Sequence, residues 1–169
     1  VARRICATQD EGYQVVAVVS AMGDSTDELL QMAHDLSADP PERELDMLLS
    51  NGERISVALL AMAIHEMGHE VISLSGRQAG IQTNTVFTKA RITGVETDRL
   101  SGELTSGKIV LVAGFQGVSV DEHSPTLAHR GSDPPAAALP ATSGPAERQL
   151  YPPVHRVSPA PPPVAGLAR

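Results

Sequence analysis

The sequence predicts an α/β fold with a mostly parallel sheet, and three observations support this prediction. Two apolar runs rich in β-branched residues, at 13–20 and 108–113, have the continuous hydrophobicity of parallel strands that are buried on both faces. Segments with helical periodicity alternate with strands, which is the pattern of right-handed βαβ units. The 169 residues are enough for one domain, and 41% of them are hydrophobic, so an aliphatic core can form although only 2% are aromatic.

The first half of the chain predicts a helix, a strand and two further helices. Residues 1–11 have the pattern of a helix end, and residues 13–20 follow as a central strand. A loop at 20–24 then leads into a helix at 25–37, where Ser25 and Glu28 have the spacing of a capping box. After two prolines, residues 42–68 predict a long helical stretch that Gly52 splits or bends.

The second half predicts three strands and one helix, followed by a segment of different composition. The strands are expected at 71–74, 86–92 and 108–113, with a loop at 76–80 and a helix at 97–106. Ten of the thirteen prolines lie between Pro134 and the last residue, where neither a helical nor a strand period is found. We therefore divide the chain into a domain at 1–133 and a Pro-rich, disordered tail at 134–169, which a shifted reading frame or an evolved tail would both explain.

Charge and composition argue against several classes of function. A formal charge of −7 and the lack of Trp disfavour both duplex binding and base stacking, so we expect no nucleic-acid partner. No uncharged apolar run reaches the ~20 residues that span a bilayer, and the first residues lack the apolar region of a signal peptide. Cys6 is the single cysteine and cannot form an internal disulfide, which fits a cytoplasmic protein.

Four short strings in fixed order carry the functional signal. They are VVSAMGDSTD at 18–27, GERIS at 52–56, GRQAGI at 76–81 and VAGFQG at 112–117. The first string ends a strand and opens a helix, where free amide N–H groups and the helix dipole favour a bound anion, and Gly23 lets the backbone approach a ligand. From this pattern alone, an ordinary capped turn is the more frequent explanation. Equally, Glu53 would face solvent or pair with Arg54, and Phe115 would be core.

Together these strings resemble the kinase domain of aspartate kinases, which belong to the amino-acid kinase superfamily. The resemblance extends over residues 1–133 and implies a three-layer αβα fold with a mostly parallel sheet, incomplete in this chain. It implies transfer of the γ-phosphoryl group of ATP to the side-chain carboxylate of L-aspartate, giving 4-phospho-L-aspartate for lysine, threonine and methionine synthesis. ATP would be the co-substrate and Mg²⁺ its metal.

The resemblance also implies roles for individual residues. It places substrate contacts at Ser20, Thr26, Glu53, Phe115, Arg130, Gly131, Ser132 and Asp133. It places nucleotide contacts at Ala21, Gly23, Asp24, Ser25 and Thr26. In the family, the glutamate that matches Glu53 recognises the amino group of aspartate, and an arginine clamps a carboxylate of aspartate. Either His129 or Arg130 takes the position of that arginine, depending on where one glycine is gapped.

Two parts of the family pattern are expected to be missing, and two other functions stay open. The Lys-x-Gly-Gly phosphate string would precede Val1 and the nucleotide-binding half would follow Asp133, so we assign no catalytic residue and expect this chain to be inactive. Full-length family members are oligomers. A non-catalytic interaction protein that uses the Pro-rich tail is one alternative.

The other alternative is a zinc protease, because HEMGH at 65–69 matches H-E-x-x-H. That chemistry needs both histidines on one face of a continuous helix together with a third ligand. Gly68 predicts that the helix ends before His69, so we assign no metal site.

Overall fold

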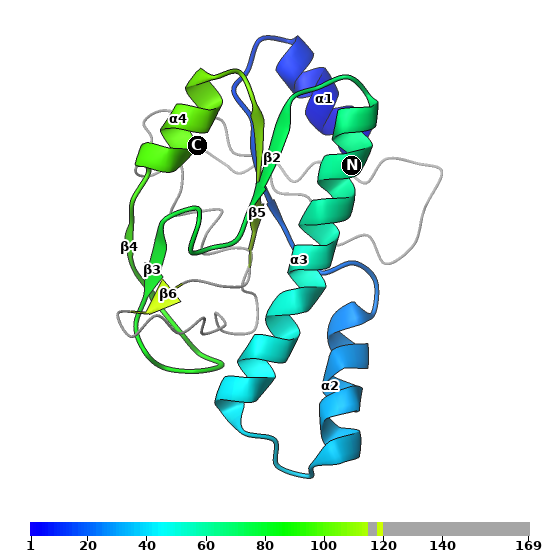
Figure 1. Cartoon of the computed structure of the whole chain (residues 1–169), viewed down its shortest axis with the longest axis vertical. Coiled ribbons are helices and arrows are strands. Elements are labelled where there is room, and N and C mark those ends of the chain that lie inside the picture. Colours follow the sequence, from blue (N-terminus) through cyan, green and yellow to red (C-terminus); the bar gives the residue numbers. More distant parts are fainter. Residues whose placement is uncertain (115–117, 120–169) are drawn as a thin grey trace, which may run out of the picture.

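The computed structural model describes residues 1–114 and 118–119, and these residues form four helices and six strands (Figure 1). In chain order they are α1 (Ala2–Asp10), β1 (Val16–Val19), α2 (Ser25–Leu36), α3 (Glu42–Glu66), β2 (Val71–Leu74), β3 (Ile81–Thr83), β4 (Ile92–Val95), α4 (Asp98–Thr105), β5 (Ile109–Ala113) and β6 (Val118–Ser119). The predicted boundary at residue 133 and the tail at 134–169 lie outside the described residues.

The main sheet has three parallel strands in the order β1-β5-β2. The strand β5 is central and buried along its whole length, as its β-branched run predicted. The prediction that residues 13–20 form a central strand is wrong, because β1 is an outer strand of the described sheet and Val16 is 37% exposed. Both runs have the apolar, β-branched pattern of a buried strand, and local sequence carries no information on their place in the sheet.

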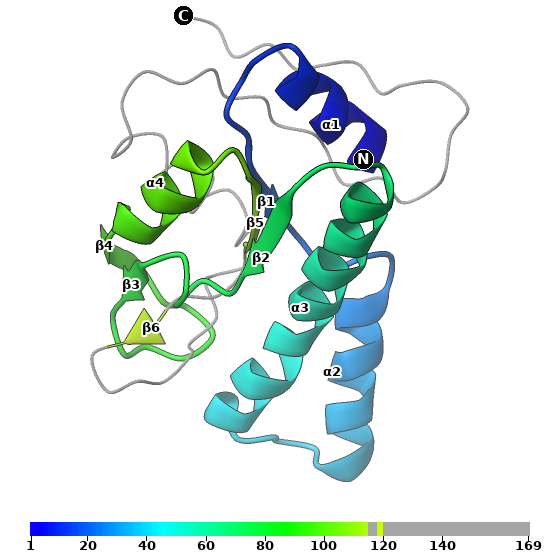
Figure 2. The ribbon, with the colours of Figure 1, turned by 45° about the horizontal axis from the view of Figure 1, so that its top comes forward.

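Helices cover both faces of this sheet, so the predicted three-layer α/β architecture is confirmed (Figure 2). The side chains of β5 alternate between the two layers, as the two-residue period of a strand requires. Ile109, Leu111 and Ala113 pack with Cys6 of α1 and with Val57 and Ile64 of α3. Val110 and Val112 point the other way and pack with Leu74, Ala79, Ile81 and Leu100, the last of which lies in α4.

A second small sheet stands beside α4 in the order β4-β3-β6. The predicted strand at 86–92 is wrong, because residues 84–91 mainly form the connection between the antiparallel strands β3 and β4. The buried Asp46 of α3 holds this connection, since its Oδ2 accepts a hydrogen bond from the backbone N–H of Thr88 at 2.9 Å. Thr88 has a φ of 57°, a backbone conformation that the local β propensity does not anticipate.

The longest helix, α3, runs without interruption from Glu42 to Glu66 and crosses the face of the main sheet (Figure 1). The prediction that Gly52 splits it is wrong, because the helix continues through this residue, and a bend at Gly52 stays a prediction. Gly52 is buried inside the helix, and a Cβ added there would lie 3.3 Å from the Cβ of Ala21. The glycine therefore allows a neighbouring loop to approach the helix closely.

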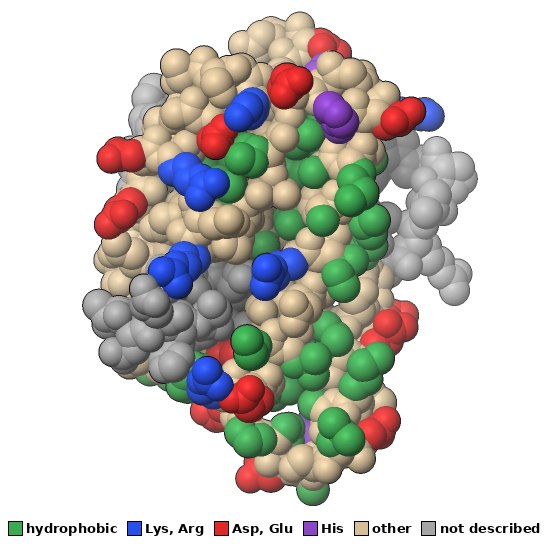
Figure 3. All heavy atoms as spheres, viewed as in Figure 1, with side chains coloured by type: hydrophobic (Ala, Val, Ile, Leu, Met, Phe, Trp, Pro, Cys, Tyr) green, Lys and Arg blue, Asp and Glu red, His purple; other side chains and the backbone are tan. Residues whose placement is uncertain are grey.

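An apolar stripe also follows the outer face of α3, where hydrophobic side chains gather in the space-filling view together with those of α2 (Figure 3). We define the α3 stripe as Met47, Ile55, Leu59 and Met62, whose exposed fractions are 61%, 55%, 47% and 67%. Among the described residues, α3 is the one helix that is long and apolar enough to cross a membrane by length and composition. Its inner face packs on the sheet through Val57 and Ile64, as expected for a helix of a globular core.

Candidate functional site

The loop between β1 and α2 carries most of the nucleotide contacts that the sequence predicted. It begins at the carboxyl end of β1, where Ser20 is exposed, and α2 begins five residues later at Ser25. The backbone N–H of Gly114, just beyond β5, donates to the carbonyl of Val19 at 3.0 Å. The loop therefore lies at the edge of the sheet where parallel strands end, which is the usual ligand edge of open α/β sheets.

Three amide groups in this loop and the first turn of α2 lack a hydrogen-bond acceptor among the described residues. Within residues 1–114, no hydrogen-bond acceptor is found for the backbone N–H groups of Gly23, Thr26 and Asp27. Gly23 has a φ of +52°, a left-handed conformation that turns the chain into α2. Amide groups at the start of a helix bind anions such as phosphate, because they donate hydrogen bonds and the helix dipole is positive there.

The predicted capping box is wrong. Asp24 precedes α2 as the N-cap, with no hydrogen bond from its side chain, and Ser25 is already the first helical residue. The hydroxyl of Ser25 donates to the carbonyl of Met22 at 2.6 Å, and the backbone N–H of Ser25 donates to the same oxygen at 3.1 Å. The side chain of Ser25 thus closes the turn and leaves the amide groups of the first helical turn uncovered.

Glu53 lies in the middle of α3 and is only 4% exposed. The interpretation of Glu53 as a solvent-facing residue, which is the default for a carboxylate in a helix, is wrong, and Arg54 is the neighbour that faces solvent. Charged side chains are rarely buried to this extent unless they bind a partner. Glu53 is not without an interaction partner in the structure, and a cationic group is the kind of partner that a buried carboxylate takes.

Two neighbours of Glu53 on α3 connect it to the loop. The hydroxyl of Ser56 accepts a hydrogen bond from the backbone N–H of Met22 at 2.9 Å and donates to the carbonyl of Gly52 at 3.1 Å. One helical turn earlier, Gly52 faces Ala21 at close range. Ser56 was not among the predicted site residues. Its spacing of three residues from Glu53 and four from Gly52 nevertheless places all three on one helical face.

The remaining predicted site residues cannot be placed relative to this loop. Phe115, Arg130, Gly131, Ser132 and Asp133 lie outside the described residues. Gly114, which precedes Phe115, is buried at the end of β5. The structure thus brings the loop at 20–24 and the Glu53 face of α3 together, and the predicted contribution of the other residues stays a prediction.

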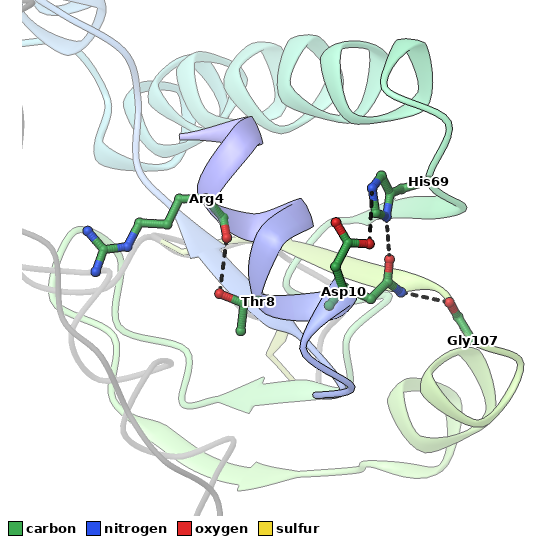
Figure 4. Close-up of polar contacts among 6 residues, drawn as sticks. Arg4, Thr8, Asp10, His69 and Gly107 are labelled. Carbon is green, nitrogen blue, oxygen red and sulfur yellow. Dashed lines mark hydrogen bonds and ion pairs between the residues drawn. The ribbon is translucent and has the colours of Figure 1, made fainter.

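The HEMGH string does not present its two histidines on one helical face, and Figure 4 shows His69 beside Asp10 of α1. The helix α3 ends at Glu66, and Gly68 has a φ of +86°, as predicted for a residue at a helix end. His69 lies beyond the helix, with its Nδ1 2.8 Å from Oε1 of Gln9 and its Nε2 3.7 Å from Oδ1 of Asp10. Gln9 also donates to the carbonyl of Gly107 at 2.8 Å, so His69 belongs to a contact between α1 and two turns.

Two further features lie away from the loop. A surface pocket of about 380 Å³ is lined by Arg77, Gln78, Gly80, Glu96, Asp98 and Arg99, and no predicted site residue lines it. Cys6 is buried between α1 and the sheet, and this burial, with a smaller effect of the Asp10 carboxylate, raises the pKa of its thiol above the ordinary value. A protonated, buried thiol is a poor nucleophile, so the fold gives Cys6 a packing role.

Comparison with known proteins defines the class of this fold. The sequence pattern of the amino acid kinase family matches residues 1–151, so the chain belongs to that family. Several of its relatives within the family are aspartokinases. It is 52% identical over 143 residues to the aspartokinase of Bacillus sp. strain MGA3, an alignment that covers 83% of this chain and 34% of that protein. It is 47% identical over 170 residues to the aspartokinase of Mycolicibacterium smegmatis, which covers 100% of this chain and 40% of that protein.

Solved structures agree with this assignment. The crystal structure of aspartate kinase from Synechocystis matches with a TM-score of 0.67 and 41% identity, over 82% of this chain and 22% of that one. Aspartokinase III of E. coli, solved in complex with aspartate and ADP, matches in fold with a TM-score of 0.57 and 24% identity, over 67% of this chain and 26% of that one. The chain thus spans about a third to two fifths of the length of the curated relatives it matches.

Proposed function

We propose that this chain is the substrate-binding part of an aspartate kinase, an enzyme that transfers the γ-phosphoryl group of ATP to the side-chain carboxylate of L-aspartate. The observation that carries the proposal is the buried Glu53, fixed on the same helical face that holds the loop at 20–24. The similarity to aspartokinases supports the choice of L-aspartate and ATP as ligands. The same proposal implies a cytoplasmic enzyme on the route to lysine, threonine and methionine, which is oligomeric at full length.

Each residue has a role that its chemistry supports. The carboxylate of Glu53 binds the ammonium group of L-aspartate, because a desolvated anion recognises a cation by charge-assisted hydrogen bonds. The hydroxyls of Ser20 and Thr26 and the free amides of the loop hold the carboxylate of the substrate and the phosphates of the nucleotide. The nucleophile is already ionised near neutral pH, since a free carboxyl group has a pKa of about 4, so the reaction needs no strong general base.

The main barrier to phosphoryl transfer here is the approach of two anions, and positive charge must lower it. Mg²⁺ supplies part of that charge when it is bound with ATP, and the described residues gather no group of three His, Cys, Asp or Glu side chains to hold it. The sequence contains two lysines. Lys89 lies in the connection between β3 and β4, and Lys108 pairs with Glu103 at 2.7 Å. We therefore propose that this chain binds substrate without catalysing turnover.

Titration of the 169-residue chain with L-aspartate tests the proposal. Binding detected by calorimetry or by NMR shifts at the loop amides is expected for the unchanged chain. Glu53→Gln removes the charge but keeps the shape, and we expect it to weaken L-aspartate binding by about tenfold or more. Glu66→Gln, at the exposed end of the same helix, is the matched control and should bind as the unchanged chain does. Equal affinities of the two variants would contradict the role of Glu53.

A coupled assay of ADP release tests the proposed lack of turnover. With L-aspartate, ATP and Mg²⁺ present, the chain by itself should release ADP at the rate of the protein-free blank. A rate above the blank that Glu53→Gln abolishes would overturn the proposal of an inactive chain while supporting the assignment of the site.

A further inference from the structure

We propose that Ser56 is a positioning residue of this site, whose hydroxyl fixes the loop at 20–24 in register with Glu53. The inference rests on the proposed function, because it assigns Ser56 to the same loop and the same glutamate. Ser56 is not proposed to bind either ligand itself. It acts through Met22, the loop residue whose backbone N–H it accepts at 2.9 Å.

The peptide groups of Met22 are held from two different helices. Its N–H donates to Oγ of Ser56 on α3, and its carbonyl oxygen accepts from the N–H and the hydroxyl of Ser25 at the start of α2. Met22 is therefore the residue at which the loop is tied both to α3, which carries Glu53, and to the start of α2, where the amides of Thr26 and Asp27 have no acceptor among residues 1–114. Its neighbour Gly23, by contrast, has no acceptor for its N–H among residues 1–114.

The surroundings of Ser56 make its hydroxyl hard to replace. Ser56 is 2% exposed, so water has little access to take over the hydrogen bond if the hydroxyl is removed. The same hydroxyl donates to the carbonyl of Gly52 at 3.1 Å, which orients its lone pair toward the loop. Gly52 lacks a side chain where Ala21 approaches, so the loop can sit close enough to α3 for the Met22 bond to form.

Loss of this bond has a defined consequence. Without the Ser56 hydroxyl, the N–H of Met22 loses its acceptor in a partly buried place, and the loop is expected to rotate so that this amide reaches solvent. The loop amides would then no longer be held at a fixed distance from Glu53. Ligands that need both Glu53 and the loop would bind more weakly, while the packing of α3 on the sheet through Val57 and Ile64 would be unaffected.

Ser56→Ala is the test, with Ser50→Ala as the matched control. Ser50 is also a buried serine of α3, 5% exposed, and its hydroxyl donates to the carbonyl of Met47 at 2.8 Å. It lies six residues before Ser56, or about 9 Å along the helix. Amide hydrogen exchange of the loop, measured by NMR on the whole chain, and affinity for L-aspartate are the two readouts. Ser56→Thr, which keeps the hydroxyl, is the conservative variant.

In the unchanged chain, the amide of Met22 should exchange more slowly than that of Gly23, relative to their intrinsic rates. Ser56→Ala should speed exchange at Met22 about tenfold and weaken L-aspartate binding by a similar factor, with no larger change in Tm than Ser50→Ala causes. Ser56→Thr should restore most of the protection at Met22. Normal protection of Met22 in Ser56→Ala, or an equal loss in Ser50→Ala, would overturn the inference.

The failure of the inference can be told apart from failure of the proposed function. If the unchanged chain binds no L-aspartate, the proposed function is wrong for this chain, and exchange at Met22 alone decides whether Ser56 holds the loop. If the unchanged chain binds L-aspartate and Ser56→Ala binds it equally well, Ser56 is not a positioning residue. If Ser56→Ala does not fold, equal protection of Met22 and Gly23 in the unchanged chain refutes the inference.

Discussion

Gly80→Ala probes a very close approach between the turn after β2 and the backbone of Glu96. Gly80 ends the turn after β2, and a Cβ added to it would lie 2.0 Å from the carbonyl oxygen of Glu96, well inside van der Waals contact. The carbonyl of Gly80 also accepts a hydrogen bond from the N–H of Glu96 at 2.9 Å, so the two segments cannot separate without loss of that bond. In addition, Gly80 has a φ of +77°, which disfavours any residue with a Cβ.

The expected loss of stability follows from these three features. A left-handed backbone costs about 1–2 kcal/mol for alanine, and forcing packed segments apart costs about 1–3 kcal/mol. A weakened hydrogen bond adds about 1 kcal/mol. We therefore expect Gly80→Ala to lower the free energy of unfolding by about 3–6 kcal/mol, a large share of the 5–15 kcal/mol that is typical of a domain.

Urea unfolding followed by circular dichroism measures this loss. Gly107→Ala is the matched control, because Gly107 has a similar φ of +83° but open space where the Cβ would go. The control should lose only the backbone part, about 1–2 kcal/mol. If the two variants lose equal stability, the contact between Gly80 and Glu96 is not what requires glycine at residue 80, and the reasoning is refuted.

Two other predictions concern buried groups. Asp46→Ala should lower the free energy of unfolding by about 2–4 kcal/mol, because it leaves a cavity and removes the acceptor of the Thr88 N–H. Asp46→Asn keeps the shape and an acceptor, so it should lose about half as much stability. Equal losses in urea unfolding would contradict this. Burial raises the pKa of the Cys6 thiol, so the folded state holds the thiol proton more tightly than the unfolded chain. The contribution of this thiol to stability is therefore complete below the ordinary pKa of 9.0 and is lost as pH rises through the raised pKa. A thiol reagent at pH 8 should label Cys6 at least ~100-fold faster in urea than in the folded chain, and equal rates would show that the thiol is accessible.

The order and type of most elements could be predicted from the sequence, because they depend on local patterns. Residues 25–37 and 97–106 were predicted as helices and correspond to α2 and α4, and the runs at 71–74 and 108–113 correspond to β2 and β5. The strand at 86–92 failed because its conformation depends on a distant contact, the hydrogen bond from Thr88 to Asp46. The predicted central position of β1 was wrong for a related reason, since the order of strands in a sheet follows from long-range pairing.

The helix α3 shows why hydrophobic periodicity alone does not reveal its part of the site. Its buried residues include four polar ones, namely Asp46, Ser50, Glu53 and Ser56. Its exposed residues include the apolar α3 stripe. The hydrophobic periodicity of the sequence therefore misidentifies which face of this helix is buried. Residue type alone would assign Glu53 to the solvent-facing side. Only the resemblance to a known family, carried by the GERIS string, predicted a buried role for Glu53.

The outward-facing α3 stripe limits which spectroscopic methods can monitor the unfolding of this protein. Environment-sensitive dyes that fluoresce on apolar surfaces would bind Ile55 and Met62 in the native state, so a dye-based melt would begin from a high baseline. Intrinsic fluorescence offers little in exchange, because the chain has no Trp and two Tyr. Far-ultraviolet dichroism and NMR of the backbone are therefore the appropriate probes, and both sense the helices and loop amides on which the proposals depend.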